Sequence, residues 1–397
     1  MRFASYRILS SVGGFALLCL SPACGGGGAG SHNTPPANTQ AIVVNAGPAG
    51  NYANGLFTTV NVCAPGTSNC QAVSGVLVDI GSFGLRVLSS ALTVPLNQQK
   101  DASGNSVIEC AQFALGVTWG PVKTADIKLA GEMAATVPVQ VIGDPAFAKV
   151  PTSCSANGSP QQDVKGLGAN GILGIGEFIQ DCGPACTPGT TNNPGFYYSC
   201  AGSSCQVTTV SAGQQVQNPV AFFSENNNGV IINLPAASSS APTLNGSLVF
   251  GIGTQNNNSL GTAQVFPIDN AGNFSTKFKG TSYTSFLDSG SNGYFFLDSG
   301  TAGLATCPSP NDGFYCPASP TALSATNISG TASNTVNFTI DNANTLFSNA
   351  SDNVFPTLGG PNPSIFDWGL PFFYGRKVYT AIESRNTPGG VGPYWAY

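Results

Sequence analysis

One four-residue pattern occurs twice in this sequence, and it constrains the fold more than any other feature. The segments 79–82 (Asp-Ile-Gly-Ser) and 288–291 (Asp-Ser-Gly-Ser) each stand between two β-prone apolar runs. The two aspartates are 288 − 79 = 209 residues apart. A repeated strand-turn-strand unit predicts two related lobes, each of which supplies one carboxylate to a shared site.

The composition indicates an all-β protein with a substantial core. Of the 397 residues, 50 are glycine and 28 are proline, while 42% are hydrophobic and only 8% are charged. Such a turn-rich chain favours many short strands over long helices. Its length favours one large two-lobed domain or two domains. The net charge is −5 and no basic patch is present, which argues against nucleic acid as a partner.

The N-terminal segment 1–24 has the pattern of a signal peptide. Arg2 and Arg7 precede an apolar stretch, residues 8–20, that is too short to span a bilayer, and small residues follow it. The sequence before Cys24 also resembles a bacterial lipoprotein signal, in which the cysteine becomes the lipidated N-terminus. We therefore expect an exported protein, either anchored as a lipoprotein in the bacterial envelope or secreted. Residues 25–40 are predicted to be a glycine-rich tether.

Cysteine usage agrees with export. Of twelve cysteines, Cys19 and Cys24 belong to the signal, and an even number remains, as expected for disulfides in an oxidising compartment. The remaining cysteines form four close pairs and leave one distant pair, as follows: Cys63/Cys70, Cys182/Cys186, Cys200/Cys205, Cys307/Cys316 and Cys110/Cys154. A zinc site at residues 182–205 is the alternative, because the cysteine spacing there is near that of zinc ligands. The absence of a nearby histidine favours disulfides.

The order of predicted parts repeats along the chain. A glycine-interrupted apolar run at residues 170–176 follows the first aspartate, and a second glycine-containing run at residues 366–379 follows the other at a similar distance. The first run has the pattern of a buried loop where backbone passes close to backbone. The repeat predicts an N-terminal lobe at residues 41–216 and a C-terminal lobe at residues 217–397.

Two further segments are predicted within the N-terminal lobe. Residues 110–120 and 124–131 indicate the two strands of a hairpin with a glycine-rich tip. Residues 178–216, rich in cysteine, proline and asparagine, indicate a surface insertion.

Taken together, these motifs resemble the pepsin-like aspartic protease superfamily, and within it a bacterial exported group of unassigned function. The segments 79–82 and 288–291 fall where that family has Asp-Thr/Ser-Gly-Ser/Thr. Residues 170–175 are similar to its Asp-Gly-Ile-Leu-Gly-Leu, residues 247–251 to its Leu-x-Phe-Gly-Gly strand, and residues 368–379 to its Leu-Gly-Asp-x-Phe-x-Arg-x-Tyr segment. The resemblance covers most of the chain from about Gly55 onward.

The resemblance implies a bilobal, all-β, pepsin-like fold with pseudo-twofold lobes. It also implies a monomer that takes a peptide or protein substrate in the cleft between the lobes, without a cofactor or metal. Asp79 and Asp288 would be the catalytic pair. Two carboxylates in hydrogen-bond contact share one proton, so the charged acid can activate a water while the neutral acid donates to the scissile carbonyl. The supporting residues would be Gly81, Ser82, Ser289, Gly290 and Ser291. A flap over the substrate is expected at residues 113–119, with Phe113, Gly116 and Trp119.

Other kinds of catalytic site are disfavoured by the sequence. The only histidine is His32, in the predicted tether, so a serine or cysteine nucleophile has no histidine base and a histidine-ligated metal has no ligands. A rival for the second acid is Asp298, which starts another Asp-Ser-Gly sequence. Asp288 is favoured because an aromatic strand follows it, as the motif requires.

One departure from the family pattern concerns activity. Ile80 stands where the family usually has threonine, whose hydroxyl takes part in a reciprocal hydrogen-bond arrangement across the lobe interface. Isoleucine cannot donate or accept, so we expect its partner Ser289 to be left unsatisfied, at about 1–3 kcal/mol. The leading hypothesis is therefore an aspartic endopeptidase. The alternatives are a catalytically weakened surface lipoprotein that binds a peptide or glycan, and a structural envelope lipoprotein.

Overall fold

The computed structural model describes residues 36–397, which are mostly β-strands with a few short helices. The predicted signal peptide, Cys24, His32 and most of the predicted tether lie outside the described residues. Strand β1 (Thr39–Asn45) includes the last two residues assigned to the tether. Within residues 36–397, no helix is long and apolar enough to cross a membrane.

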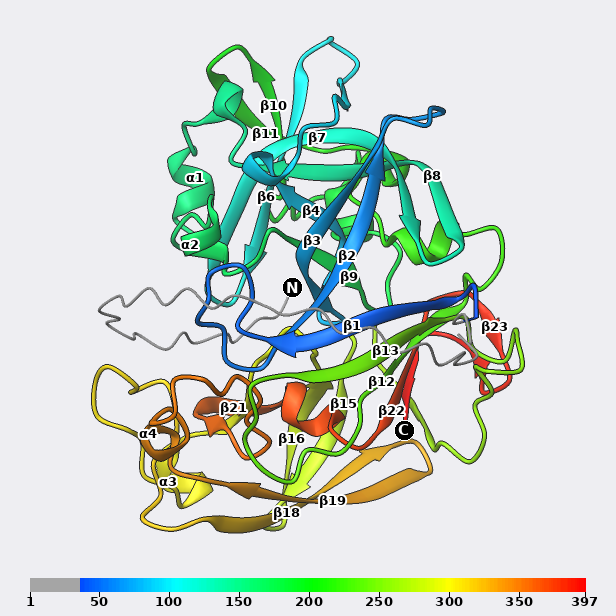
Figure 1. The fold of residues 1–397 in the computed structure, drawn as a ribbon. Helices are drawn as coiled ribbons and strands as arrows, with labels where there is room; N and C mark the ends of the chain where they lie inside the picture. The colour runs from blue at the N-terminus through cyan, green and yellow to red at the C-terminus, as the bar shows by residue number, and fades with distance from the viewer. Residues whose placement is uncertain (1–35) are drawn as a thin grey trace, which may run out of the picture.

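The chain forms two lobes that lie one above the other in Figure 1, with the N-terminal half in blue to green and the C-terminal half in green to red. The all-β pepsin-like fold predicted from the sequence is confirmed. The upper lobe contains β2 (Gly55–Cys63), β3 (Cys70–Asp79), β4 (Phe83–Leu88), β6 (Ser106–Phe113), β7 (Gly116–Leu129), β8 (Glu132–Ile142) and β9 (Gly171–Ile175). The lower lobe contains β15 (Phe274–Phe278), β16 (Thr281–Leu287), β17 (Tyr294–Leu297), β18 (Thr321–Ser329), β19 (Ala332–Ile340) and β21 (Asn362–Trp368).

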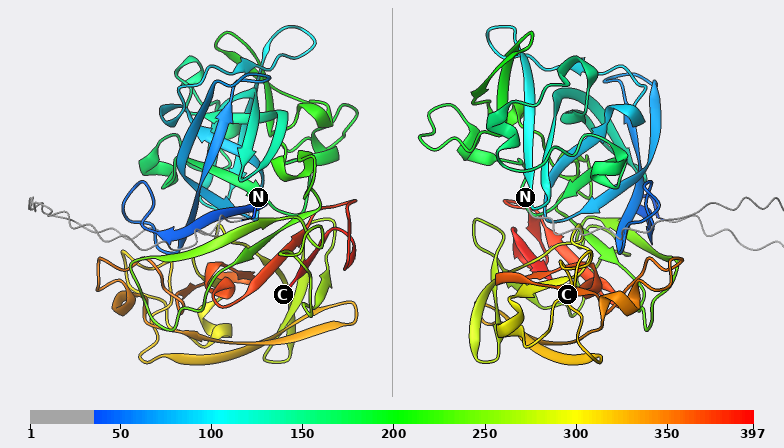
Figure 2. Two further views of the ribbon diagram at one scale, coloured as in Figure 1. Left: turned by 45° about the vertical axis from the view of Figure 1, so that its right-hand side comes forward. Right: turned by 90° about the vertical axis from the view of Figure 1, so that its left-hand side faces the viewer.

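Strand β1 joins the two lobes. It pairs antiparallel with β2 on one side and with β13 (Leu244–Phe250) on the other. The sheet continues through β12 (Gly229–Asn233), β22 (Lys377–Ala381) and β25 (Tyr394–Ala396). Figures 1 and 2 show β1 and β13 side by side between the lobes. The interface is therefore built on continuous backbone hydrogen bonding, which fixes the relative position of the lobes.

The same strand arrangement surrounds each aspartate. In the first lobe, β9 runs between β3, to which it is parallel, and β4, to which it is antiparallel. In the second lobe, β21 runs between β16 and β17 with the same two orientations. Each Asp-x-Gly-Ser turn links the two outer strands of such a trio. The repeat predicted from the sequence therefore corresponds to a repeated three-strand unit.

The apolar run at residues 170–176 differs from the predicted loop, because it is a buried strand, β9. The close backbone approach that we predicted for its glycines is present. A Cβ on Gly171 would lie 2.4 Å from Arg86 O, and one on Gly174 would lie 2.6 Å from Phe83 N. Glycine is needed here because the backbone of the neighbouring strand β4 lies too close to leave room for a side chain.

The predicted hairpin register is wrong. The turn of the hairpin falls at Ala114 and Leu115, between β6 and β7, with Cys110 opposite Trp119. Gly120 lies inside the long strand β7 and not at a tip. A Cβ there would lie 1.9 Å from Val141 O, so this glycine allows β8 to approach closely and does not form a turn.

Part of the predicted surface insertion at residues 178–216 belongs to the sheet of the N-terminal lobe. It contains β10 (Tyr197–Ala201) and β11 (Ser204–Thr208), and β10 extends the sheet of β6. Tyr197 and Tyr198 are buried, because β10 places them against the side of the hairpin.

The described cysteines form five disulfides with the pairing that the spacing favoured. They are Cys63–Cys70, Cys110–Cys154, Cys182–Cys186, Cys200–Cys205 and Cys307–Cys316. The zinc alternative is excluded, because its four cysteines are consumed in two of these bonds. Cys110–Cys154 ties strand β6 to the short helix α1 (Thr152–Ser155).

Candidate active site

Asp79 and Asp288 occupy equivalent places in the two lobes. Asp79 is the last residue of β3, and Asp288 directly follows β16. Both side chains are completely buried. The crossing strands β9 and β21 hold the two turns from behind, so the acids project from rigid elements toward the lobe interface.

The first turn supplies donors to its own aspartate. The N–H of Gly81 donates to Asp79 Oδ1 at 2.8 Å, and the Ser82 hydroxyl donates to Oδ2. The second turn does the same for Asp288, with the N–H groups of Gly290 and Ser291 at 2.7 and 3.2 Å from Oδ1. The Ser291 hydroxyl lies 3.0 Å from Asp288 Oδ2. Every one of these supporting residues was among those predicted from the sequence.

The two carboxyl groups meet across the interface. They hydrogen-bond to each other. A Cβ placed on Gly81 would lie only 2.6 Å from Asp288 Cγ, so any larger residue would push the second acid away. Glycine in the first motif is therefore a condition for the acids to approach.

Burial and mutual repulsion favour a shared proton. Burial, and next the charge of Asp288, raises the pKa of Asp79 well above its usual value. Burial also raises the pKa of Asp288, while hydrogen bonds from Asp79, Gly290 and Ser291 act in the opposite direction. Two such groups titrate as a pair, with one proton between them over a broad pH range.

The expectation that Ser289 is left unsatisfied by Ile80 is wrong. The Ser289 hydroxyl donates to Val78 O at 2.9 Å and accepts from the N–H of Ile80 at 3.1 Å. Both partners belong to the backbone, so they are present whatever side chain residue 80 carries. One half of the reciprocal arrangement is thus intact. The other half lacks its hydroxyl, because the buried Ile80 side chain has no polar atom.

The rival aspartate has a different role. Asp298 is the N-cap of helix α3 (Ser299–Ala302), where it accepts from the N–H of Thr301 at 2.9 Å and from its hydroxyl at 2.6 Å. These bonds, with the hydroxyl first, lower its pKa. Asp298 is exposed, so Asp288 and not Asp298 faces the first acid.

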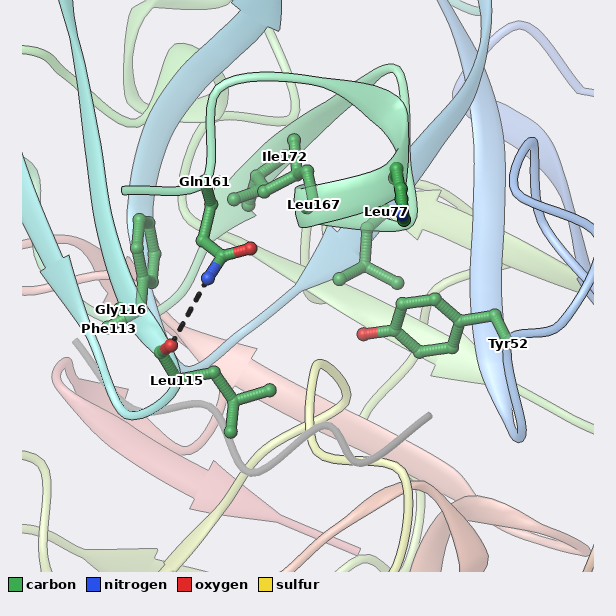
Figure 3. A pocket seen from close by; sticks show the side chains of 10 residues that line it. Tyr52, Leu77, Phe113, Leu115, Gly116, Gln161, Leu167 and Ile172 are labelled. Carbon is green, nitrogen blue, oxygen red and sulfur yellow. Dashed lines mark hydrogen bonds between the residues drawn. The ribbon is translucent and has the colours of Figure 1, made fainter. Parts of the chain in front are cut away.

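A pocket lies beside Asp79 under the tip of the β6–β7 hairpin. Its volume is about 340 Å³, and its lining is mostly apolar. Leu77 lies two residues before Asp79 on the same strand, so both side chains lie on one face of β3. Figure 3 shows Phe113 and Leu115 on the hairpin side and Tyr52 and Leu77 opposite them. The pocket therefore adjoins the acid pair.

The hairpin carries the three flap residues predicted from the sequence, but they differ in position. Phe113 and Gly116 line the pocket, and Gln161 Nε2 donates to Leu115 O at 3.3 Å (Figure 3). Trp119 is completely buried away from the pocket. Its indole N–H donates to Phe147 O at 2.8 Å, and its ring meets Tyr198 edge to face.

Comparisons with known proteins agree with this geometry at the level of the fold. A family model described as "Protein of unknown function (DUF3443)" matches residues 34–397. The chain belongs to this family. The aspartic proteinase from Irpex lacteus has a similar crystal structure, with a TM-score of 0.52 and 15% identity over 90% of this chain and 96% of that one. At this identity the likeness shows the fold alone. No curated protein matches the chain.

Sequence reasoning missed a buried charge cluster in this DUF3443 chain. The guanidinium of Arg86, on β4, contacts Glu109 on β6 and lies 3.0 Å from Asp181 Oδ2. It also donates to Phe83 O at 2.8 Å, and its carbon lies 5.7 Å from the centre of the Phe113 ring. The cluster therefore links the first aspartate turn to strand β6. No local motif could have revealed it, because the partners are 23 and 95 residues from Arg86 in sequence.

Tyr52 was also missed. It belongs to the connection between β1 and β2, far from the motifs, and Figure 3 shows its hydroxyl directed into the pocket. A lone tyrosine in a glycine-rich connection carries no sequence signal of such a place.

Proposed function

We propose that this protein is an aspartic endopeptidase. The observation that carries the proposal is the direct hydrogen bond between two completely buried carboxyl groups, Asp79 and Asp288, at the lobe interface. Paired buried acids of this kind are suited to general acid–base hydrolysis without a covalent intermediate.

The donors around each acid suggest their roles. Asp288 is approached by two backbone N–H groups and a hydroxyl, whereas Asp79 receives one N–H and one hydroxyl. Additional donors stabilise a carboxylate, so Asp288 is the better site for the charge and Asp79 for the proton. In the proposed reaction Asp288 takes a proton from a water, whose oxygen attacks the peptide carbonyl carbon. Asp79 donates its proton to the carbonyl oxygen. When the tetrahedral intermediate collapses, Asp288 passes its proton to the leaving nitrogen and the hydroxyl proton of the intermediate returns to Asp79. The peptide bond breaks and two peptides are released.

The pocket beside Asp79 supports a peptide substrate with a large apolar side chain. Leu77, Phe113, Leu167 and Ile172 give it apolar walls. Burying such a side chain stabilises the complex by about 1.5–3 kcal/mol. Cleavage is therefore expected next to bulky apolar residues.

The test is cleavage of an unfolded peptide library between about pH 3 and pH 7, with products identified by mass spectrometry. The wild type should cleave, and Asp79→Asn and Asp288→Asn should each lose about 10²–10⁴-fold in rate, the usual contribution of acid–base catalysis. Asp298→Asn is the control, because it removes an exposed aspartate of the same Asp-Ser-Gly type. Cleavage that survives both dyad substitutions would exclude the proposal. A folded protein that binds library peptides without cutting them would favour the alternative, a peptide-binding protein with a weakened site.

A further inference from the structure

A third buried carboxyl group lies next to the acid pair. Asp367, on β21, is 3% exposed. Its Oδ2 lies 2.5 Å from the Ser291 hydroxyl oxygen, and the same oxygen lies 3.0 Å from Asp288 Oδ2. Ser291 thus stands between Asp288 and Asp367. The contact follows from topology, because β21 runs between the two strands that flank the second turn.

A serine hydroxyl has one proton, so it can donate to only one of these carboxylates. When Asp367 is ionised, the shorter contact draws the Ser291 proton, and Asp288 loses that donor. When Asp367 is neutral, its own O–H donates to Ser291, and Ser291 donates onward to Asp288. The protonation state of Asp367 therefore decides whether Asp288 is supported as an anion.

We propose that Asp367 is a positioning residue which raises the proton affinity of the Asp79–Asp288 pair through Ser291 and so moves the working pH of the site upward. The inference rests on the proposed function. Two effects of an ionised Asp367 act in the same direction. It withdraws the Ser291 donor from Asp288, and it adds a negative charge beside a buried acid, which disfavours a second charge there.

Asp367 reaches the dyad through Ser291. Its neighbours across β16 and β17 are Phe286 and Phe295, neither of which titrates. The titratable group that it faces through Ser291 is Asp288, and beyond it lies Asp79. Asp367 and Asp288 are both buried, and the interaction between buried charges is poorly screened.

The main experiment compares pH profiles of kcat/KM for the wild type and Asp367→Asn. The variant removes the charge, and its amide still donates to Ser291. The acid limb should move to lower pH by about one unit or more. Asp298→Asn, which removes an exposed aspartate, should leave the limb in place. An unchanged acid limb in a folded Asp367→Asn protein would overturn the inference.

A second variant guards against misfolding. Ser291→Ala removes the hydroxyl through which Asp367 acts on Asp288, so Asp367→Asn should move the acid limb less in the Ser291→Ala background than in the wild type. A purely structural role for Asp367 and Ser291 would lower kcat in both variants without moving the limb, and that outcome would also overturn the inference.

A readout independent of activity separates this inference from the proposed function. Infrared difference spectra recorded during a pH titration follow the C=O band of buried neutral carboxyl groups. In Asp367→Asn the part of the titration that belongs to the Asp79–Asp288 pair, identified as the part that Asp79→Asn removes, should shift downward by about one unit. If the wild type cleaves no peptide but this shift is present, the protease proposal fails and the inference stands. If the titration is unchanged, the inference fails.

Discussion

Replacing Ile80 by threonine tests whether the lobe interface can accept a second reciprocal hydroxyl. Ser289 and Ile80 occupy the same place in their motifs, directly after the aspartate. The Ser289 hydroxyl contacts Val78 O, which lies two residues before Ile80, and the N–H of Ile80 itself. By the pseudo-twofold relation between the motifs, a hydroxyl at position 80 would meet Leu287 O and the N–H of Ser289. Ile80 and Leu287 line one cavity of about 640 Å³, and the N–H of Ile80 already donates to the Ser289 hydroxyl, so the two motifs meet at this place.

The magnitude follows from comparing threonine with valine, which has the same shape without the hydroxyl. Ile80→Val removes one buried methylene and should cost about 0.5–1.5 kcal/mol of unfolding free energy. A hydroxyl that finds both partners contributes about 0.5–1.5 kcal/mol, whereas a buried hydroxyl without partners costs about 1–3 kcal/mol. Ile80→Thr should therefore be more stable than Ile80→Val by about 1 kcal/mol. The opposite sign is expected if the partners are out of reach.

Urea unfolding of the two variants at one pH measures this difference directly, and the cleavage assay adds a second readout. Because the hydroxyl would hold the two turns together, Ile80→Thr should also have a higher kcat/KM than Ile80→Val. A threonine variant that is less stable than the valine variant by 1 kcal/mol or more would refute the reasoning, since it would show that the mirror-image partners are not available.

Two further predictions concern buried charge. Arg86→Met leaves two buried acidic side chains without their cation and should lower the free energy of unfolding by about 3–5 kcal/mol. Lys123→Met breaks a partly exposed ion pair and should lower it by less than about 1 kcal/mol. Urea unfolding compares the two variants, and equal losses of stability would contradict the role of Arg86. Burial, and next the charge of a neighbouring carboxylate, raises the pKa of Asp79 and of Asp181, so the folded chain keeps protons that the unfolded chain releases above about pH 4. Stability should thus be highest in acid and fall by about 1.4 kcal/mol per pH unit for each retained proton as the pH rises toward the folded pKa values. Asp181→Asn should make this fall less steep, and stability that rises from pH 4 to pH 7 would contradict the sign.

The features that could be predicted from sequence are those whose cause is local. An Asp-x-Gly-Ser turn satisfies its aspartate with donors two and three residues away, so the pattern itself specifies the structure. The four close cysteine pairs were predictable for the same reason, because each disulfide joins residues that are near one another in sequence. Repetition of the turn then implied the two lobes, because a unit that appears twice in equivalent surroundings is expected to fold in the same way twice.

Features that depend on contacts between one strand and another part of the chain could not be predicted. Gly120 was interpreted as a turn residue, since glycine is common in turns, but its actual constraint is the backbone of Val141 on the next strand. Asp367 was present in a run already singled out, yet its contact with Ser291 requires knowing that β21 passes behind the second turn. In both cases the residue type was visible and its partner was not.

The side chain after the first aspartate illustrates why a motif mismatch is weak evidence about a site. The family pattern led us to expect that a missing hydroxyl at position 80 would leave Ser289 without partners. Ser289 instead bonds to a carbonyl and an N–H that every residue possesses. The substitution therefore removes one of two cross-lobe contacts and leaves the other unchanged. Alignment of the acids depends as well on Gly81, which no side chain can replace at 2.6 Å from Asp288 Cγ. Of the two positions, Gly81 is the stricter requirement for a working pair, and Gly81→Ala should damage the site more than any substitution at Ile80.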